Sequence, residues 1–158
     1  KLVTGVQTCA LPILSKSPSL REEVDLNLRS AAAVIYSQFE KAAGDTGITS
    51  SQYNVLRILK GIYPEGHARC EIAMRMIERN PDITRIIDRL EKQGLVERDR
   101  DIEDRRMSIT KITKKGLSLV NELKPLIEKA HREITKNLSD KECEQLSTLL
   151  EKLYGHLL

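Results

Sequence analysis

The sequence is poor in the residues that build β-rich and disulfide-bonded proteins. It has no Trp, one Phe and four Tyr, so aromatic residues make up only 3% of its 158 positions. This scarcity disfavours an all-β sandwich and favours helices packed through Leu, Ile and Ala. The cysteines Cys9, Cys70 and Cys143 show no C-x-x-C pattern, which argues against a disulfide framework and a zinc site. A reducing cytoplasm fits this cysteine usage best.

Signatures of membrane proteins and enzymes are also missing. No apolar run approaches the ~18 residues that span a bilayer, so we expect no membrane association. The motifs G-x-S-x-G, G-x-G-x-x-G, H-E-x-x-H and the P-loop are absent. The histidines His67, His131 and His156 lack the spacing of metal ligands. We therefore expect a protein that is not an enzyme and that binds no cofactor and no metal.

The net charge of the chain does not identify its binding partner. Lys and Arg number 26 against 23 Asp and Glu, which gives a net charge of +3 and a pI of about 8.8. This balance permits contact with a polyanion but is far from the excess that would indicate one.

The length favours a single domain, because 158 residues are too few for two well-buried cores. Residues 1–14 (KLVTGVQTCALPIL) lack the exit site of a secretory signal and precede the first helical pattern. We interpret them as a non-native or disordered leader, and residues 15–158 as the domain.

Capping boxes predict helices at both ends of this domain. The S/T-x-x-E/Q spacing that starts a helix occurs in the pairs Ser19–Glu22, Thr49–Gln52 and Ser139–Glu142. Apolar periodicity continues the first helix to about residue 43 and the second to about residue 61, and it lines the final helix with leucines. Thr113 is the expected cap of another long helix, which runs to about residue 137.

Two shorter helices are predicted between the second helix and this long one. Residues 69–79 form the third helix, with an apolar stripe of Cys70, Ala73, Met74 and Ile77. Asn80 as N-cap and Pro81 at the first helical position predict that a separate fourth helix starts there. Its stripe is Ile83, Ile86, Ile87 and Leu90, and Gly94 with Leu95 ends it in a Schellman-type cap.

A β-hairpin follows, with strands at 95–99 and 107–112 and a charged connector at 100–106. The predicted fold is mainly α with a small β-hairpin, in the order α-α-α-α-β-β-α-α. Three short helices followed by a hairpin are the parts of a winged helix-turn-helix, in which the helix before the hairpin enters the major groove of DNA.

The fourth helix has a polar face that suits base reading. Its stripe leaves Arg85, Asp88 and Lys92 opposite the core, with Asp82, Thr84 and Arg89 flanking them. Near the helix N-terminus, Arg85 can pair with guanine, Asp82 or Asp88 can accept from cytosine, and the Thr84 methyl suits thymine. The alternative is a solvated face on which Arg85 and Asp88 pair with each other or with Arg89.

The hairpin connector carries as many acids as bases. Residues 98–106 contain four Arg and four acidic residues, so DNA binding requires that the acids be used internally. We expect Asp104 to brace the wing, and Arg105 and Arg106 to contact DNA, with Arg106 entering the minor groove. The alternative is a solvated, mutually neutralised loop.

Three stretches of the sequence resemble the multiple-antibiotic-resistance regulator (MarR) family. They are ITSSQYNVLRIL, DITRIIDRLEKQGLVERDRDIEDRRMSITKITKKG and LSDKECEQLSTLLEKL, and the likeness extends from about Leu20 to Leu158. The most specific part is the D-x-R of Asp104 and Arg106 followed by the T-x-x-G of Thr113 to Gly116. The resemblance implies that Asp82, Thr84 and Arg85 face bases, that Asp104 braces the wing and that Arg106 enters the minor groove.

The resemblance also implies how the molecule is organised. Helices at 19–45 and 113–158 would interlock with a second subunit, and 48–112 would form the winged helix-turn-helix. The implied function is a cytoplasmic, ligand-responsive repressor that binds double-stranded DNA as a homodimer on a pseudo-palindromic operator. A cleft lined by apolar residues of the first, second and fifth helices would accept a small aromatic or anionic effector.

Two alternatives remain. One is a winged-helix module that binds protein, for which Arg85 and Arg106 would be dispensable. The other is a regulator that senses oxidants through cysteine. Cys70 and Cys143 occupy apolar-face positions, so we expect both thiols to be packed rather than reactive.

Overall fold

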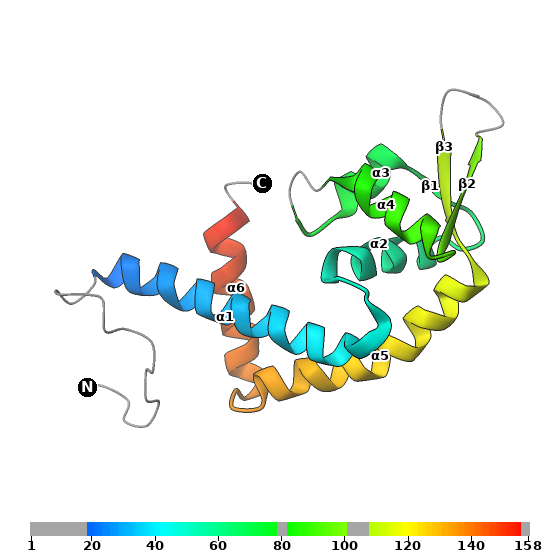
Figure 1. Ribbon diagram of the computed structural model, residues 1–158. Helices are drawn as coiled ribbons and strands as arrows, with labels where there is room; N and C mark the ends of the chain where they lie inside the picture. The colour runs from blue at the N-terminus through cyan, green and yellow to red at the C-terminus, as the bar shows by residue number, and fades with distance from the viewer. Residues whose placement is uncertain (1–18, 79–81, 101–107, 156–158) are drawn as a thin grey trace. The chain divides into compact units, whose positions relative to one another are not determined.

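A computed structural model describes residues 19–78, 82–100 and 108–155. The element order, shown in Figure 1, is α1 (Leu20–Ala43), a 3₁₀ turn (Gly44–Thr46), α2 (Ser50–Lys60), β1 (His67–Ala68), α3 (Arg69–Arg75), α4 (Ile83–Lys92), β2 (Val96–Arg100), β3 (Ser108–Ile112), α5 (Lys114–Thr135) and α6 (Asp140–Tyr154). The predicted mainly helical fold with a hairpin is confirmed. The chain divides into two compact units between Val34 and Ile35, so the first half of α1 is described separately from the rest.

The predicted caps start the long helices. Thr49 and Ser139 both form complete capping boxes, and Ser19 Oγ accepts from the Glu22 amide at 3.3 Å. Thr113 accepts a hydrogen bond from the Gly116 amide at the start of α5. These side chains satisfy amides that have no partner within their own helix.

The boundaries of α3 and α4 differ from the prediction. α3 ends at Arg75 rather than near residue 79, and Ile72 is its buried residue. α4 begins at Ile83, and Asp82 caps it by accepting from the Arg85 amide at 3.2 Å. Asn80 as the N-cap is therefore wrong, because the carboxylate of Asp82 performs that task; residues 79–81 lie outside the described chain.

The C-terminus of α4 is closed as predicted and is joined to α5. Gly94 has φ of +70°, which glycine adopts without strain, and the Leu95 amide donates to the Leu90 carbonyl at 2.9 Å. Thr113 Oγ1 donates to the Gly94 carbonyl at 2.8 Å, and Lys115 Nζ donates to the Gln93 carbonyl at 2.7 Å. The first turn of α5 thus holds the end of α4.

α2 is the centre of the hydrophobic core. Its residues Val55, Leu56 and Leu59 are fully buried. Around them lie Ile72 of α3, Ile83, Ile87 and Leu90 of α4, Val96 of β2, Ile112 of β3, and Val120, Leu123 and Ile127 of α5. The predicted stripe of α4 therefore faces the core, and Ile86 is partly buried against it. This packing fixes which face of α4 remains exposed.

The sheet has the order β1-β3-β2, with both pairings antiparallel. β2 and β3 form the predicted hairpin, in which Val96 pairs with Ile112 and Arg100 with Ser108. β1, a two-residue strand at His67 and Ala68, was not predicted. It pairs with Thr110 and Ile109 of β3 and joins the start of α3 to the base of the hairpin.

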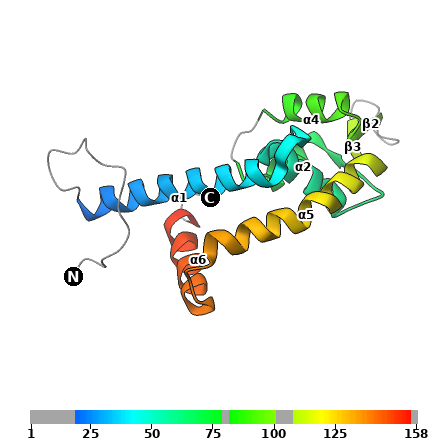
Figure 2. The ribbon, with the colours of Figure 1, turned by 60° about the horizontal axis from the view of Figure 1, so that its bottom comes forward.

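α6 leaves the far end of α5 at a steep angle (Figure 2). None of its residues is buried in the single chain. Exposed apolar residues on the C-terminal helices are Leu126, Leu146, Leu149, Leu153 and Tyr154; those on α1 are Leu20, Val24, Val34, Ile35 and Tyr36. Within the described ranges, no helix is long and apolar enough to cross a membrane.

Candidate nucleic-acid interface

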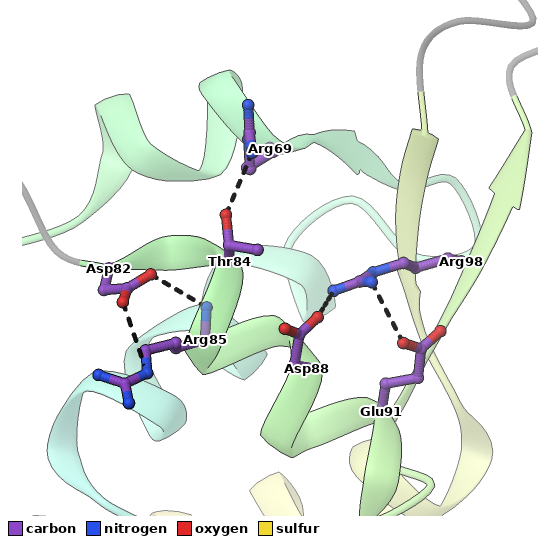
Figure 3. Close-up of polar contacts among 7 residues, drawn as sticks. All are labelled: Arg69, Asp82, Thr84, Arg85, Asp88, Glu91 and Arg98. Carbon is purple, nitrogen blue, oxygen red and sulfur yellow. Dashed lines mark hydrogen bonds and ion pairs between the residues drawn. The ribbon is translucent and has the colours of Figure 1, made fainter.

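The exposed face of α4 carries the predicted base-reading residues. Thr84, Arg85 and Arg89 are exposed, and Asp88 is half-buried. The Arg85 side chain is 75% exposed, and its Nε lies 3.7 Å from Asp82 Oδ2 (Figure 3). The alternative pairing of Arg85 with Asp88 is not formed; each of them has a different partner.

Asp82 has two roles in this geometry. One oxygen accepts from the Arg85 amide and the other faces the Arg85 guanidinium. Its carboxylate therefore caps the helix and also faces the side chain that is predicted to read a base. Sequence reasoning had assigned Asp82 only to base contact.

Arg98 of β2 connects the hairpin to α4, as Figure 3 shows. Its Nη2 donates to Asp88 Oδ1, and its Nη1 lies 3.4 Å from Glu91 Oε2. The Arg98 side chain retains 32% of its exposure, so the group is partly shielded from solvent. Asp88, predicted to contact cytosine, is thus occupied by a protein cation, and the two acids anchor the base of the wing.

Arg69 was missed by sequence reasoning. Its Nη1 donates to the Thr84 hydroxyl at 3.1 Å (Figure 3), which leaves the Thr84 methyl available for an apolar contact. Arg69 is the first residue of α3, where a positive charge opposes the helix dipole. That unfavourable placement was the available signal that Arg69 serves something other than helix stability.

A hollow of about 390 Å³ separates the start of α3, α4 and the hairpin. Arg69, Cys70, Thr84 and Arg98 line it, together with Ser108 and Thr110 of β3. Two guanidinium groups therefore border the space between the predicted reading helix and the wing. We call this space the α3–α4 hollow.

The expectation that Cys70 is packed is wrong. The apolar face of α3 is centred on Ile72, which turns Cys70 outward and exposes its thiol beside the hollow. Met74 and Ile77, assigned to the same stripe, are also exposed. Cys143 is half-buried.

The predicted wing contacts Asp104, Arg105 and Arg106 lie outside the described residues. The described hairpin ends at the pair Arg100 and Ser108. Below it, Lys111 Nζ donates to Asp99 Oδ2 at 2.7 Å across the strands, and this carboxylate raises the pKa of the Lys111 ammonium. One acid near the wing is therefore used internally.

A second cavity lies within the unit that begins at Ile35. It has a volume of about 170 Å³ and is lined by Ile35, Tyr36 and Phe39 of α1, Ser50, Tyr53, Asn54 and Arg57 of α2, Ile77, and Ile127, Ala130, His131 and Ile134 of α5. We call it the α1–α2–α5 cavity. Apart from Ile77, its lining comes from the three helices that the sequence predicted to line an effector cleft.

The lining of this cavity includes the polar groups of Tyr53 and Arg57. Among the described residues, Arg57 takes part in none of the ion pairs. Burial raises the pKa of the Tyr53 hydroxyl, against the opposing effect of Arg57, so Tyr53 is protonated at neutral pH and can donate. The Tyr53 ring packs against Phe39, with centroids 5.6 Å apart.

The helices α2, α3 and α4 followed by the hairpin define a winged helix-turn-helix protein. The MarR family model matches residues 48–108. A crystal structure of a MarR transcription factor from Planctomyces limnophilus is 34% identical, covers 86% of this chain and 98% of its own, and superposes with a TM-score of 0.66. The chain belongs to the MarR family of DNA-binding transcriptional regulators, and it is not an enzyme.

Two other relatives carry informative descriptions. The homoprotocatechuate degradative operon repressor of Escherichia coli is 29% identical over 134 residues, which cover 84% of this chain and 88% of the repressor. The second is the structure of Bordetella bronchiseptica BpsR, a protein whose DNA binding is regulated by 6-hydroxynicotinic acid. It is 24% identical to this chain, the match covers 83% of this chain and 98% of BpsR, and the TM-score is 0.73.

Proposed function

We propose that the protein is a ligand-responsive repressor that binds a pseudo-palindromic operator as a homodimer in the cytoplasm. The observation that carries this proposal is the exposed polar face of α4. Its apolar stripe is buried against α2, and its far end is held by α5. A helix fixed in this way can present Arg85 and Thr84 to the major groove without further ordering.

We assign DNA binding and dimerisation to the segments that the sequence predicts for them. Residues 48–112 would bind DNA, and 19–45 and 113–158 would form the dimer. The apolar residues left exposed on α6, such as Leu146, Leu149 and Leu153, support a second copy as their cover, because contiguous apolar surface is costly in water. A two-fold dimer would place its reading helices on half-sites about one helical turn apart.

In each subunit we assign base reading to Thr84 and Arg85 near the start of α4. Arg89 would contact the phosphate backbone, and Asp82 and Asp88 would position their neighbours through the ion pairs described above. The wing roles of Asp104, Arg105 and Arg106 remain as predicted from the sequence. A module that binds protein instead would not depend on Arg85 or Arg106.

The α1–α2–α5 cavity is the proposed effector site. An apolar cavity of about 150 Å³ suffices to bind benzene, so its volume of about 170 Å³ suits one aromatic ring. Arg57 in the cavity lining supplies a cation for a carboxylate, and Tyr53 supplies a hydroxyl. A monocyclic aromatic carboxylate is therefore the proposed class of effector.

The test is a shift assay with the gene's own upstream DNA, with and without homoprotocatechuate or 6-hydroxynicotinic acid. These aromatic acids should weaken the complex, whereas catechol, which lacks the carboxylate, should act less. Arg57→Gln should reduce the response to the acids and leave DNA binding without ligand unchanged. Failure to bind that DNA would contradict the repressor proposal; binding without any response to the acids would contradict only the effector class.

A further inference from the structure

The segment Met76–Glu78, which follows α3, reaches the α1–α2–α5 cavity through Ile77. Ile77 lines this cavity, yet its side chain is 83% exposed. Apolar surface left in water gives a bound ligand an apolar contact to gain. A ligand in the cavity would therefore touch this segment as well as the helices.

α2 holds the segment by two side-chain contacts. The Ser51 hydroxyl donates to the Glu78 carboxylate, with oxygen distances of 2.7 and 2.9 Å. One turn further along α2, Asn54 Nδ2 donates to Met76 Sδ at 3.6 Å. Asn54 also lines the cavity. The same stretch of α2 thus forms the cavity wall and anchors the segment.

The segment is also close in sequence to the start of the reading helix. Asp82, which caps α4, follows Glu78 by four residues, and four residues span at most about 14 Å. Glu78 is therefore separated by only three residues from Asp82, which caps α4 and faces the Arg85 guanidinium.

We propose that Met76–Glu78 couples the effector cavity to α4, with the Ser51–Glu78 hydrogen bond as the tie that holds the DNA-binding arrangement. A ligand in contact with Ile77 would favour an arrangement in which this tie is broken and the start of α4 is displaced. The ligand shifts the equilibrium because it binds the two arrangements with different affinity. This inference rests on the ligand response proposed above.

The experiment compares Ser51→Ala with Ser118→Ala. Both changes remove a hydroxyl that donates to a glutamate, but Ser51 contacts Glu78, whereas Ser118 contacts Glu122 on α5 and does not line the cavity. The Kd of homoprotocatechuate is measured by titration calorimetry for the free protein and for its complex with upstream DNA, after circular dichroism has shown that each variant is folded.

In the wild type the two Kd values should differ by about five-fold or more, which is the usual lower range of coupling between sites. Ser51→Ala should bring them within about two-fold of each other, while Ser118→Ala keeps the wild-type ratio. A ratio unchanged in both variants would overturn the coupling role of Ser51 and leave the effector proposal intact.

A ligand-free measurement keeps the inference testable if the aromatic acids do not bind. Absence of binding would contradict the proposed effector class, but it would not contradict the role of the Ser51–Glu78 hydrogen bond. Hydrogen exchange at the amides of Arg85 and Ile86, which donate to Asp82, should then be faster in Ser51→Ala than in Ser118→Ala, because the start of α4 is less restrained. Equal exchange in the two variants would overturn the tie itself.

Discussion

Arg85 and Arg106 are expected to contact different grooves, so their replacement should have different effects. Arg85→Ala should cost about 1–3 kcal/mol on the operator and relax discrimination at one base position. Arg106→Ala should weaken many sequences together and reduce the salt dependence of binding. Fluorescence anisotropy on operator and scrambled DNA at several salt concentrations distinguishes the two patterns.

Asp104 provides the control for the wing. If Asp104 braces the loop, Asp104→Ala should weaken DNA binding like Arg106→Ala, although loss of an acid would otherwise favour binding to a polyanion. Tighter binding by a folded, dimeric Asp104→Ala variant would show that the loop is only a charged connector.

Arg98 should matter more for DNA binding than for stability. Its ion pairs with Asp88 and Glu91 are partly exposed, and such pairs contribute about 0–1 kcal/mol. Arg98→Met should therefore change the melting temperature little, yet it should weaken operator binding, since the wing loses its anchor and two acids are left unpaired near DNA. Asp88→Asn in the Arg98→Met background should recover part of the loss. Wild-type operator affinity in Arg98→Met would contradict this role.

The exposed thiol of Cys70 offers a steric probe of the proposed interface. Because it borders the α3–α4 hollow, a maleimide adduct should prevent close approach of DNA. In a Cys9→Ser and Cys143→Ser background, alkylation should abolish the shifted band, and bound operator DNA should slow the alkylation. Full DNA binding by the alkylated protein would place the interface elsewhere.

At the scale of elements, Glu71 links β1 to α3. Its Oε2 accepts from the Ala68 amide at 2.9 Å and lies 3.1 Å from His67 Nδ1. The Ala68 amide, and then His67, hold the pKa of this carboxyl below its ordinary value of 4.5. The native state thus binds the proton more weakly than the unfolded chain, and the resulting stabilisation is complete above pH 4.5 and is lost as the pH falls through the lowered pKa.

Glu71→Gln should therefore reduce the loss of stability in acid. Urea denaturation across the range from neutral pH to below the lowered pKa measures the free energy of unfolding, which should fall less steeply in Glu71→Gln than in the wild type. Glu23→Gln, in the first turn of α1, controls for removal of an acidic residue. The same slope in wild type and Glu71→Gln would contradict the assignment.

The sequence predicts the long elements well because their signals are local. Capping boxes and apolar periodicity locate α1, α2, α5 and α6, and Gly94 correctly ends α4. The existence of β1 and the buried face of α3 depend instead on three-dimensional packing. β1 exists only because β3 pairs with it, and two residues carry no periodicity of their own. In α3, several apolar residues compete for the core side, and Ile72 occupies it instead of Cys70 and Met74.

For the candidate site, the sequence identified the face of α4 but not the partners of its residues. The Arg98 anchor was accessible from strand alternation, since Arg98 is two residues after the buried Val96 and so shares its face. The use of Asp82 as the N-cap was not accessible from the sequence, because Asn80 is an equally good capping residue. Only the position of the first buried residue, Ile83, decides between them.

At the scale of the whole molecule, we expect a homodimer at micromolar concentration. Leu149 of α6 is 64% exposed in the single chain, so Leu149→Glu should place a charge in the subunit interface and shift the protein toward monomers. Lys152→Glu, on the same helix, should not. Light scattering measures both. A monomeric wild type would contradict the dimer and, with it, the palindromic operator.

The contacts between the end of α4 and the start of α5 make the reading helix move together with α5. Thr113 and Lys115 fasten the reading helix to one end of α5, and the 22 residues of α5 form an arm about 33 Å long. A tilt of about 6° at the far end of such an arm moves its tip by about 3.4 Å, which equals the axial step between neighbouring nucleotides of a strand. A rotation of this size would thus carry a reading helix one base pair out of register.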